Sequence, residues 1–439
     1  MEKWSPATAF TQPISNRQSL DPMSDAIKWP RVSAAWLQSP AISKVFAAIA
    51  KGGAEARVVG GAVRNALIDR PVKEVDIGTT ALPDDVMRLA RDAGLGAHPT
   101  GIDHGTVTVV ADKQPFEVTT LRRDLETDGR HAVVTFTTSW DDDAARRDFT
   151  INALYCSSDG TLYDPVGGLD DLRKRRVRFI GSPEARIRED FLRILRFFRF
   201  SAEYGNGHLD PAGLDAANAL KDGLSLLSAE RVRIETLKLL AATGAVNVLK
   251  VMYESGILQL ILRTRLEPDR LARLAAIETT LGEAPDPLTR LAALAVVQPG
   301  DAAFLAEQLK LSNAEASKLA VAATGDPGID PAAPETAARA ALYRLGPEAF
   351  RRAVRLAWAR SGASPNAQEW RSRTLLPDRW QAPTMPFSGS DVLALGIAPG
   401  PAVGNVLHAF ERSWIDNDFP SDAEWQSKVL KELALKALA

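Results

Sequence analysis

A glycine pair and the acidic residues that follow it have the composition of a phosphate-transfer site. Gly60 and Gly61 lead into a predicted helix with Arg64 on its first turn, where a guanidinium can hold a triphosphate oxygen. Glu74 and Asp76 follow in a strand pattern, and residues i and i+2 of a strand point to one face. The spacing predicts that both carboxylates reach one Mg²⁺ site. A plain strand–helix–strand connection with a surface ion pair is the alternative.

A third carboxylate, Glu117, interrupts the apolar and hydroxylic segment 116–121. Burying a carboxylate costs free energy unless it is paired or bound to a metal. Glu117 is therefore a candidate third metal ligand, or a general base for an attacking hydroxyl. The alternative is a charge on an edge strand that faces water.

Residues 146–148, Arg-Arg-Asp, form a compact charged motif ahead of an apolar run. Arg147 can contact a phosphate or a base, and Asp148 can cap a helix or hold an arginine. A surface charge cluster without a ligand is the alternative.

Arginines recur at every third position of residues 189–199, with apolar residues between them. We expect a helix on which Asp190, Arg193 and Arg196 form one ridge and Glu189 pairs with Arg193. An Asp beside an Arg matches a base edge that carries an amino group next to a ring acceptor. Cytosine and adenine have this edge, whereas guanine and uracil present the reverse. Asp190 and Arg193 are therefore predicted to accept C and A, with Arg196 and Arg199 in support.

The composition limits where a nucleic acid can bind. The formal net charge is −2 over 439 residues, so any nucleic-acid surface must be local. The basic run 173–178 is either a solvated face or a set of RNA phosphate contacts. Cys156 is the single cysteine, which excludes an internal disulfide and Cys-rich metal sites, and we expect it to be buried.

The chain carries no apolar run long enough to cross a bilayer, and its first residues lack the apolar core of a secretory signal. These features favour the cytoplasm, with no membrane partner and no evident obligate protein partner.

The elements that must position these residues divide into a β-containing N-terminal part and an all-helical remainder from about residue 182. Charged residues 122–132 show no period and are predicted to form a mobile loop. Strand and helix patterns are expected in the following ranges: strands 57–59, 74–78, 106–110, 116–121 and 133–138, with a hairpin turn at 111–114, and helices 40–51, 62–67 and 83–93. The predicted class is α+β.

Taken together, these residues resemble the class II tRNA nucleotidyltransferases, the CCA-adding enzymes, in the superfamily that includes bacterial poly(A) polymerases. Five motifs lie in the family's order: a metal motif (60–64 with 74–76), a ribose and phosphate motif (146–148), a motif between head and neck (164–168), an amino-acid template for CTP and ATP (189–193) and a neck motif that steadies it (228–235).

The resemblance implies a nucleotidyltransferase head with a mixed sheet, followed by a helical neck, body and tail. We expect an extension (1–30), a head (31–180), a neck (181–265), a body (266–380) and a tail that contacts tRNA (381–439). The implied reaction adds C, C and A to the 3′ end of tRNA from CTP and ATP, with release of pyrophosphate.

The resemblance also implies roles for individual residues. Two Mg²⁺ ions are expected at Glu74 and Asp76, with Glu117 as a further catalytic candidate. The nucleotide is expected to contact the following residues: Gly60, Gly61, Arg64, Arg147, Asp148, Glu189, Asp190, Arg193, Arg196 and Arg199.

Two positions depart from the family pattern. Asp is usual where this chain has Glu74, and also where it has Asn65. The Asn65 difference implies the loss of only an indirect contact. Glu is one methylene longer than Asp, and Mg²⁺ demands near-ideal geometry, so Glu74 predicts reduced activity or a preference for the larger Mn²⁺.

Two rival functions remain open within this resemblance. A poly(A) polymerase typically ends in a strongly basic tail, whereas the C-terminal region here carries Asp416, Asp418, Asp422 and Glu424. Residues 99–107 and the segment 122–131, which resembles the loop needed to switch to ATP, also favour complete CCA addition. A metal-impaired RNA-binding homologue is the third possibility, because of Glu74.

Overall fold

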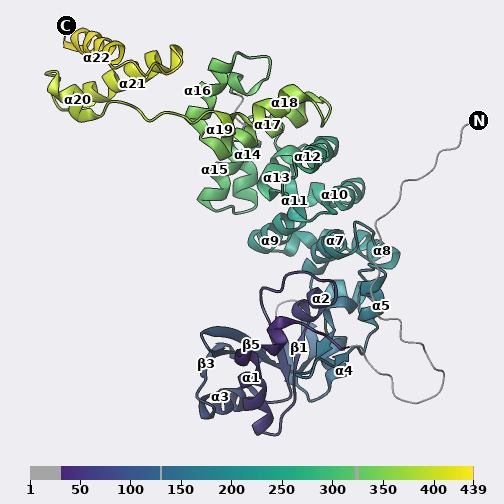
Figure 1. Ribbon diagram of the computed structural model, residues 1–439. Coiled ribbons are helices and arrows are strands. Elements are labelled where there is room, and N and C mark those ends of the chain that lie inside the picture. The colour runs from purple at the N-terminus through teal and green to yellow at the C-terminus, as the bar shows by residue number, and fades with distance from the viewer. Residues whose placement is uncertain (1–30, 129–130, 322–325, 439) are drawn as a thin grey trace, which may run out of the picture.

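The chain folds into an elongated, curved molecule with a β-containing head at one end and the C-terminal helices at the other (Figure 1). The computed structural model describes residues 31–128, 131–321 and 326–438, and side chains outside 124–134. The predicted extension, residues 1–30, lies outside the described residues. The division into an α/β head and a helical remainder confirms the predicted α+β class.

The head is built on one mixed sheet. Its strand order is β3-β4-β5-β2-β1-β8-β9, and β2 pairs with β5 in parallel while the other neighbours are antiparallel. The strands of this sheet are β1 (Ala56–Val59), β2 (Asp76–Thr79), β3 (Gly96–Gly101), β4 (Thr106–Ala111), β5 (Gln114–Thr120), β8 (Tyr155–Cys156) and β9 (Leu162–Tyr163). Cys156 is buried, as predicted.

Alternation along the strands gives the sheet two different faces. Val58, Ile77 and Val118 point to one side, where they share a core with α1 (Pro40–Lys51) and α3 (Pro83–Asp92). The neighbouring residues of β1 and β2, Val59 and Asp76, must then point to the opposite side. Apolar side chains from α4 (Trp140–Ala145) cover only part of that side, and the acidic residue of β2 lies there.

The β4–β5 hairpin is confirmed, with a tight turn at Asp112 and Lys113, which both have positive φ. The predicted mobile loop is wrong for the part that the structure describes. β6 (Arg122–Asp128) and β7 (His131–Phe136) pair as a separate two-stranded sheet. The sequence did not predict β6 because its residues are charged and lack the apolar pattern of a strand, whereas pairing of the backbone needs no apolar side chains.

Helices make up the rest of the molecule, and many begin with proline at the first helical position, which needs no hydrogen-bond donor there. The remaining head helices are α2 (Gly61–Leu67) and α5 (Gly168–Arg173). The helices that follow are α6 (Pro183–Glu189), α7 (Leu192–Tyr204), α8 (Pro211–Ala219), α9 (Ala229–Ala241), α10 (Ala245–Glu254), α11 (Ile257–Leu262), α12 (Pro268–Leu281), α13 (Pro287–Ala295), α14 (Asp301–Gln308), α15 (Asn313–Val321), α16 (Glu335–Leu345), α17 (Pro347–Ser361), α18 (Gln368–Thr374), α19 (Leu376–Arg379), α20 (Gly389–Ala394), α21 (Pro401–Asp416) and α22 (Ala423–Leu438).

An aromatic cluster joins the head to α7. Phe149 of the head lies 5.2 Å from Phe200 between ring centroids, and Phe179 stacks on Phe197 at 5.5 Å. Phe149, Phe179 and Phe197 are fully buried. Rings of this size dominate the burial of apolar surface, so the cluster holds the head and α7 in one core.

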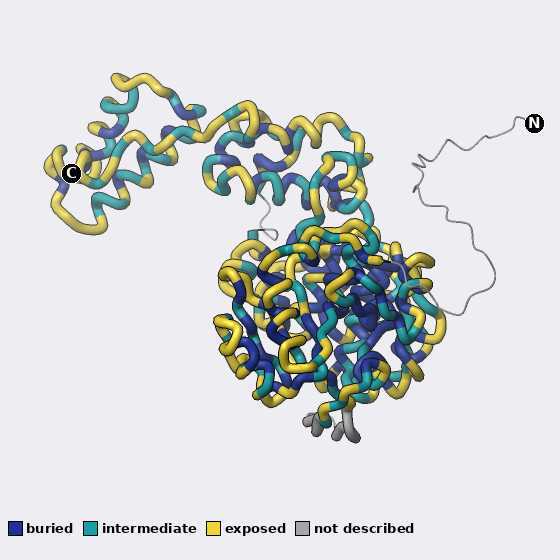
Figure 2. Tube along the Cα trace, turned by 60° about the horizontal axis from the view of Figure 1, so that its bottom comes forward, coloured by how far each residue is buried: buried dark blue, intermediate teal, exposed yellow. Residues whose placement is uncertain are grey.

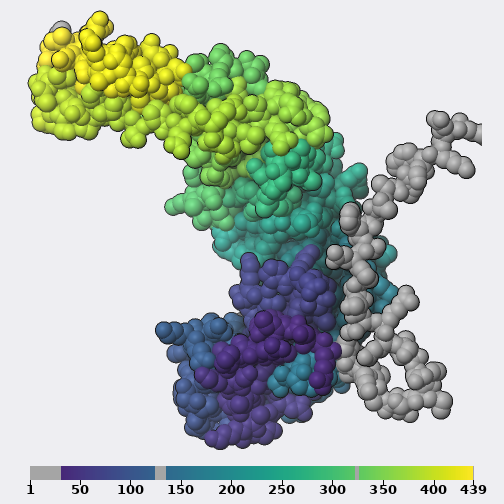
Figure 3. Space-filling view, viewed as in Figure 1, coloured from purple at the N-terminus to yellow at the C-terminus, as the bar shows by residue number. Residues whose placement is uncertain are grey.

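The C-terminal helices have a core of their own. Phe410 and Trp414 of α21 pack with Val392 of α20 and Leu430 of α22, apart from the main core. Figure 2 shows buried residues gathered in the head and adjoining helices, while the C-terminal arm is thinner and more exposed. The space-filling view shows one concave side between the head and that arm (Figure 3).

Candidate active site

Three carboxylates line one cavity at the edge of the head. Asp76 of β2 and Glu117 of β5 are direct partners in the parallel pairing, so their side chains lie on the same face of the sheet. Glu74 lines the same cavity of about 590 Å³, but it precedes β2, which begins at Asp76. The two carboxylates thus reach one cavity, as predicted, but the predicted reason, alternation along a shared strand, is wrong. The sheet places Glu117 beside Asp76 instead.

The surroundings of Asp76 make its negative charge unfavourable. Partial burial raises the pKa of Asp76, and the nearby carboxylates of Glu117 and Glu74 raise it further. Among the described residues, Arg147 acts in the opposite direction. β5 is an interior strand, so the reading of Glu117 as an edge-strand charge is also wrong, although its side chain is exposed.

These acidic residues fit a divalent cation chemically, because a cation would relieve their mutual repulsion and carboxylate oxygens are the ligands that Mg²⁺ prefers. Within the described part of the chain, no three His, Cys, Asp or Glu side chains are already arranged to hold a metal ion. Trp36 also lines this cavity and was not predicted from the sequence. No pattern in the sequence connects Trp36 with the carboxylates.

The glycine pair stands beside this cavity at the start of α2. Gly60 has φ 72° and ψ −120°, a conformation that favours glycine, and its N–H donates to the carbonyl of Leu154 at 2.9 Å. A Cβ atom on Gly60 would lie 3.8 Å from the guanidinium of Arg147. Gly61 follows as the first residue of the helix. The turn therefore brings bare backbone next to Arg147.

Arg147 is held in place from within the head. Its guanidinium donates to Asp143 at 2.9 and 3.1 Å and to the hydroxyl of Tyr155 at 3.1 Å. Burial alone would raise the pKa of Asp143, but Arg147 and Arg146 outweigh it and lower that pKa. The sequence contained a signal for Asp143, since Arg146 and Arg147 follow it at the i+3 and i+4 positions of a helix.

Arg64 lies elsewhere than expected. Only 6% of its surface is exposed, and its guanidinium donates to Asn152 and, at 2.6 Å, to the hydroxyl of Tyr204. Burial lowers the pKa of Arg64 from its usual value. The side chain contacts protein groups at the joint between head and α7, so its predicted contact with a triphosphate requires these bonds to open.

Arg64 is one member of a closed ring of polar contacts at this joint, which we call the joint ring. From Arg64 the contacts run through Asn152 to Asp148, and Asp148 accepts from Arg196 at 2.8 Å. Arg196 lies 3.8 Å from Glu235, which accepts from Arg199 at 2.5 Å. Contacts from Arg199 to Glu203, from Tyr204 to Glu203 and from Arg64 to Tyr204 close the circuit.

The joint ring neutralises its own charges. Burial would raise the pKa of Asp148, but Arg196, Asn152 and the backbone N–H of Phe149 favour its ionised form and lower that pKa. The structure thus brings together Asp148, Arg196 and Arg199, three of the residues predicted to contact the nucleotide. It also adds Asn152 and Tyr204, which no sequence pattern indicated.

The predicted base-selecting residues lie where α6 ends and α7 begins. Asp190 is the residue after α6, with extended backbone, so the predicted single helical ridge through Asp190 is wrong. Its carboxylate accepts from the backbone N–H of Leu192 at 3.0 Å and from Arg231 of α9 at 2.7 Å. The predicted pairing of Glu189 with Arg193 is present despite the helix break.

Arg186 connects these residues to the head. Its guanidinium donates to the backbone carbonyl of Arg147 at 2.7 Å and pairs with Glu189, which also holds Arg193. Arg147 in turn acts electrostatically on Asp76. Contacts through Arg186 therefore connect Arg147, which lies near Asp76, with the predicted base-selecting residues.

Comparisons with known proteins agree with this arrangement. Residues 56–178 match the family model described as the poly A polymerase head domain, and residues 208–265 match the probable RNA and SrmB-binding site of polymerase A. The Danio rerio protein named CCA tRNA nucleotidyltransferase 1, mitochondrial, is 36% identical over 378 residues, 82% of this chain and 83% of that protein. The chain belongs to the CCA tRNA nucleotidyltransferase family.

Other members of the CCA tRNA nucleotidyltransferase family extend the match. The CCA-adding enzyme of Limosilactobacillus fermentum is 29% identical, covering 90% of this chain and 96% of that one. The crystal structure of the Bacillus stearothermophilus CCA-adding enzyme in complex with CTP superposes with a TM-score of 0.66 at 29% identity, covering 91% and 99% of the two chains. The chain is accordingly a nucleotidyltransferase, as its motifs predicted. None of its described helices combines the length and apolar character of a bilayer crossing.

Proposed function

We propose that this chain adds C, C and A to the 3′ end of tRNA from CTP and ATP, without a nucleic-acid template and with release of pyrophosphate. The observation that carries the proposal is the chain of contacts through Arg186, which links Arg147, the arginine that acts electrostatically on Asp76, to Glu189 and Arg193. Through these contacts, the residues that select the base and the residues that transfer the phosphoryl group would bind the same nucleotide. The names of the relatives in the preceding section support the same reaction.

Mg²⁺ is the proposed cofactor, as two ions, with Mn²⁺ as the alternative. Asp76 and Glu74 would hold the metal. Glu117, which pairs with Asp76 in the sheet and lines the same cavity, would serve as a further ligand. Divalent cations held there would supply activation of the tRNA 3′ hydroxyl and neutralisation of the leaving pyrophosphate. The protein contributes the concentrated negative charge, with Arg147 near Asp76 and Lys73 on the wall of the cavity as positive charges beside it.

The triphosphate and sugar are assigned to the glycine turn and to Arg147. The backbone of Gly60 lies next to the guanidinium of Arg147, and Asp143 and Tyr155 hold that group in a single orientation. A preoriented guanidinium stabilises charge that develops during phosphoryl transfer without having to rearrange. Asp148, Arg196 and Arg199 support this position through the joint ring, whose members Asn152 and Arg64 lie next to the glycine turn.

Base selection is assigned to Asp190 and Arg193. Arg231 and the N–H of Leu192 fix the carboxylate of Asp190, and Glu189 fixes Arg193. A carboxylate accepts from an exocyclic amino group and a guanidinium donates to a ring acceptor, a combination that suits C and A.

We propose the same residue ranges for the head, neck, body and tail domains as the sequence predicted. The concave side between head and C-terminal arm could follow an elongated RNA (Figure 3). We assign tRNA contacts to the region after residue 381, where α20 and α21 pack around their own core. The cytoplasm stays the predicted compartment, although the fish relative is named as mitochondrial.

One assay tests the reaction. The protein is incubated with tRNA that ends before CCA, with labelled CTP, ATP or both, and the products are sized on a gel. Addition that stops at three nucleotides is expected. A long A tail would instead identify a poly(A) polymerase, and tRNA binding without incorporation would identify a metal-impaired RNA-binding protein.

A second assay tests the assignment of base selection. Asp190→Ala is expected to incorporate UTP and GTP. Its rate of CTP addition should fall by a smaller factor than its preference for CTP and ATP over UTP and GTP. Asp215→Ala, which removes an exposed carboxylate from nearby α8, is the matched control. Unchanged selectivity in Asp190→Ala would refute the role.

A further inference from the structure

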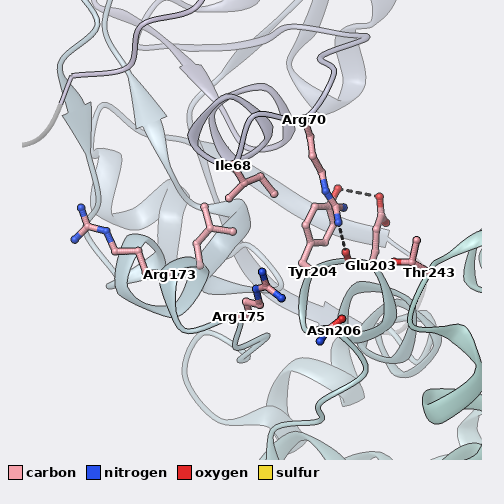
Figure 4. Close-up of a pocket in the computed structure, with 9 residues that line it drawn as sticks. Ile68, Arg70, Arg173, Arg175, Glu203, Tyr204, Asn206 and Thr243 are labelled. Carbon is pink, nitrogen blue, oxygen red and sulfur yellow. Dashed lines mark hydrogen bonds between the residues drawn. The ribbon is translucent and has the colours of Figure 1, made fainter. Parts of the chain in front are cut away.

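A second cavity lies at the far end of α2 and α7 from the glycine turn. Its volume is about 300 Å³, and its lining includes Arg70, Arg175, Tyr204, Asn206 and Thr243. Figure 4 shows Arg70 and Arg175 approaching this space from two sides, while the guanidinium of Arg173 points away. Arg70 follows α2 and Arg175 follows α5, so two separate parts of the head supply the charge.

The basic run 173–178 divides into two sets by its partners. Lys174 pairs with Asp170, and Arg176 and Arg178 pair with Asp171. For Arg175, as for Arg70, no carboxylate within ion-pair distance is found in the described part of the chain. Arg173 also lacks such a partner among the described residues, but of the two unpaired arginines only Arg175 is directed to the cavity, so the run is not a uniform solvated face (Figure 4).

Contacts hold the side chain of Arg70 in position, and the backbone at Arg175 has an uncommon conformation. Arg70 donates to the backbone carbonyl of Glu203 at 2.8 Å, and its guanidinium carbon lies 4.9 Å from the ring centroid of Tyr204. Arg175 and Asn206 both have φ 53°, a left-handed conformation that is uncommon for residues other than glycine. Backbone of this kind persists where the surrounding structure demands it.

One carboxylate, Glu203, also lines the cavity, but its charge is already engaged. It accepts from Arg199 at 3.1 Å and from the hydroxyl of Tyr204 at 2.9 Å. The cavity therefore offers two guanidinium groups against one neutralised carboxylate. Guanidinium groups recognise phosphate oxygens with paired hydrogen bonds.

We propose that this cavity binds a phosphate-type oxyanion through Arg70 and Arg175. This cavity shares no lining residue with the carboxylate cavity, and Tyr204 separates it from the buried Arg64: the guanidinium of Arg64 lies 3.9 Å from the centroid of the ring that Arg70 also contacts. The anion is either free inorganic phosphate or pyrophosphate, or a backbone phosphate of bound RNA. The RNA source rests on the proposed function, whereas binding of free phosphate does not.

The test compares the intact protein with Arg175→Gln, Arg70→Gln and the matched control Lys174→Gln, which removes a charge from the same run outside the cavity. The melting temperature is measured against inorganic phosphate, with chloride at equal ionic strength and with chelator present. The apparent phosphate Kd follows from its concentration dependence. Loss of one charge-assisted contact is expected to raise that Kd about tenfold in Arg175→Gln and Arg70→Gln, but not in Lys174→Gln.

The RNA source is tested with tRNA binding over a range of salt concentrations. If a backbone phosphate occupies the cavity, the slope of log K against log salt falls by about 0.7 to 0.9 in Arg175→Gln relative to Lys174→Gln. If only free phosphate binds, the tRNA slopes coincide while the phosphate Kd values differ. The proposal is overturned if both cavity variants match Lys174→Gln in both measurements. CCA addition by the wild-type protein, measured separately, tests the proposed function independently.

Discussion

Two groups of charged residues lie on either side of the glycine turn, and they are organised in opposite ways. In the joint ring each carboxylate has a basic partner, as Glu235 has Arg199 and Asp148 has Arg196. In the carboxylate cavity, Asp76 is partly buried and faces two further carboxylates, and among the described residues Arg147 opposes their effect. The first arrangement lowers the pKa of its Asp148, and the second raises the pKa of its Asp76.

This difference separates residues that hold the protein together from residues that await a ligand. A charge that is neutralised inside the fold contributes to the native geometry, and removing its partner leaves it buried and uncompensated. A charge that is crowded by its own kind weakens the fold slightly and becomes favourable only when a cation arrives. We therefore expect substitutions in the two groups to have opposite effects on activity and stability.

The largest effect is expected for Asp76→Asn. Nucleotide addition should fall by on the order of 10³-fold, because the residue with the most concentrated negative surroundings is lost. Thermal stability should not fall, since the raised pKa of Asp76 means that its charge opposes folding. Addition assays and melting curves check both statements, with the exposed Asp92→Asn on α3 as control. A large loss of stability would place Asp76 with the structural charges instead.

Glu235→Gln should show the opposite pattern in its effect on stability. The carboxylate of Glu235 is buried against Arg199, so its removal should lower the free energy of unfolding by about 3 to 5 kcal/mol. Urea denaturation measures this change. The exposed Glu254→Gln on α10 should change it by less than about 0.5 kcal/mol. Equal effects in the two variants would show that the joint ring adds nothing to stability.

A smaller effect is expected in the pH dependence of stability. The pKa of Asp148 is lowered, so its contribution is present above its unfolded value of about 3.9 and is lost as pH falls through the folded pKa. Stability of Asp148→Asn should therefore fall less steeply than wild type below about pH 4.

The pH dependence of stability in Asp76→Asn should differ from that of wild type in the direction opposite to Asp148→Asn. The pKa of Asp76 is raised, so the ionised wild-type side chain opposes folding above the unfolded value, and the variant should gain relative stability as pH rises from about 4. Melting temperatures across this pH range compare the two variants, and slopes of the same sign would contradict the contrast between the two sites.

The smallest effect is expected for Glu74→Asp. Glu74 lies before β2 and reaches the cavity from a loop, so shortening it should change turnover only several-fold, with an increase in Mg²⁺ and a smaller one in Mn²⁺. Steady-state rates in the two metals measure this difference. Indistinguishable rates of variant and wild type in both metals would exclude a metal-tuning role for Glu74.

Much of the head followed from local patterns. Period-two alternation located β4 and β5, and the turn between them carries Asp112 and Lys113 as predicted. The short strands β8 and β9, with two residues each, are too brief for any periodicity to appear. The strand β6 was missed because its charged residues resemble a loop, although its backbone pairs with β7.

The sequence by itself determined the chemistry: which carboxylates, arginines and glycines are present, and in what order the motifs run. Only the tertiary structure decided which of them meet. Parallel pairing of β2 with β5 places Glu117 beside Asp76, and the packing of α7 on the head turns Arg64 toward Tyr204. Spacing along the chain reports neighbours within one element, whereas these contacts depend on how separate elements pack, because burial of apolar surface selects that arrangement for the whole molecule.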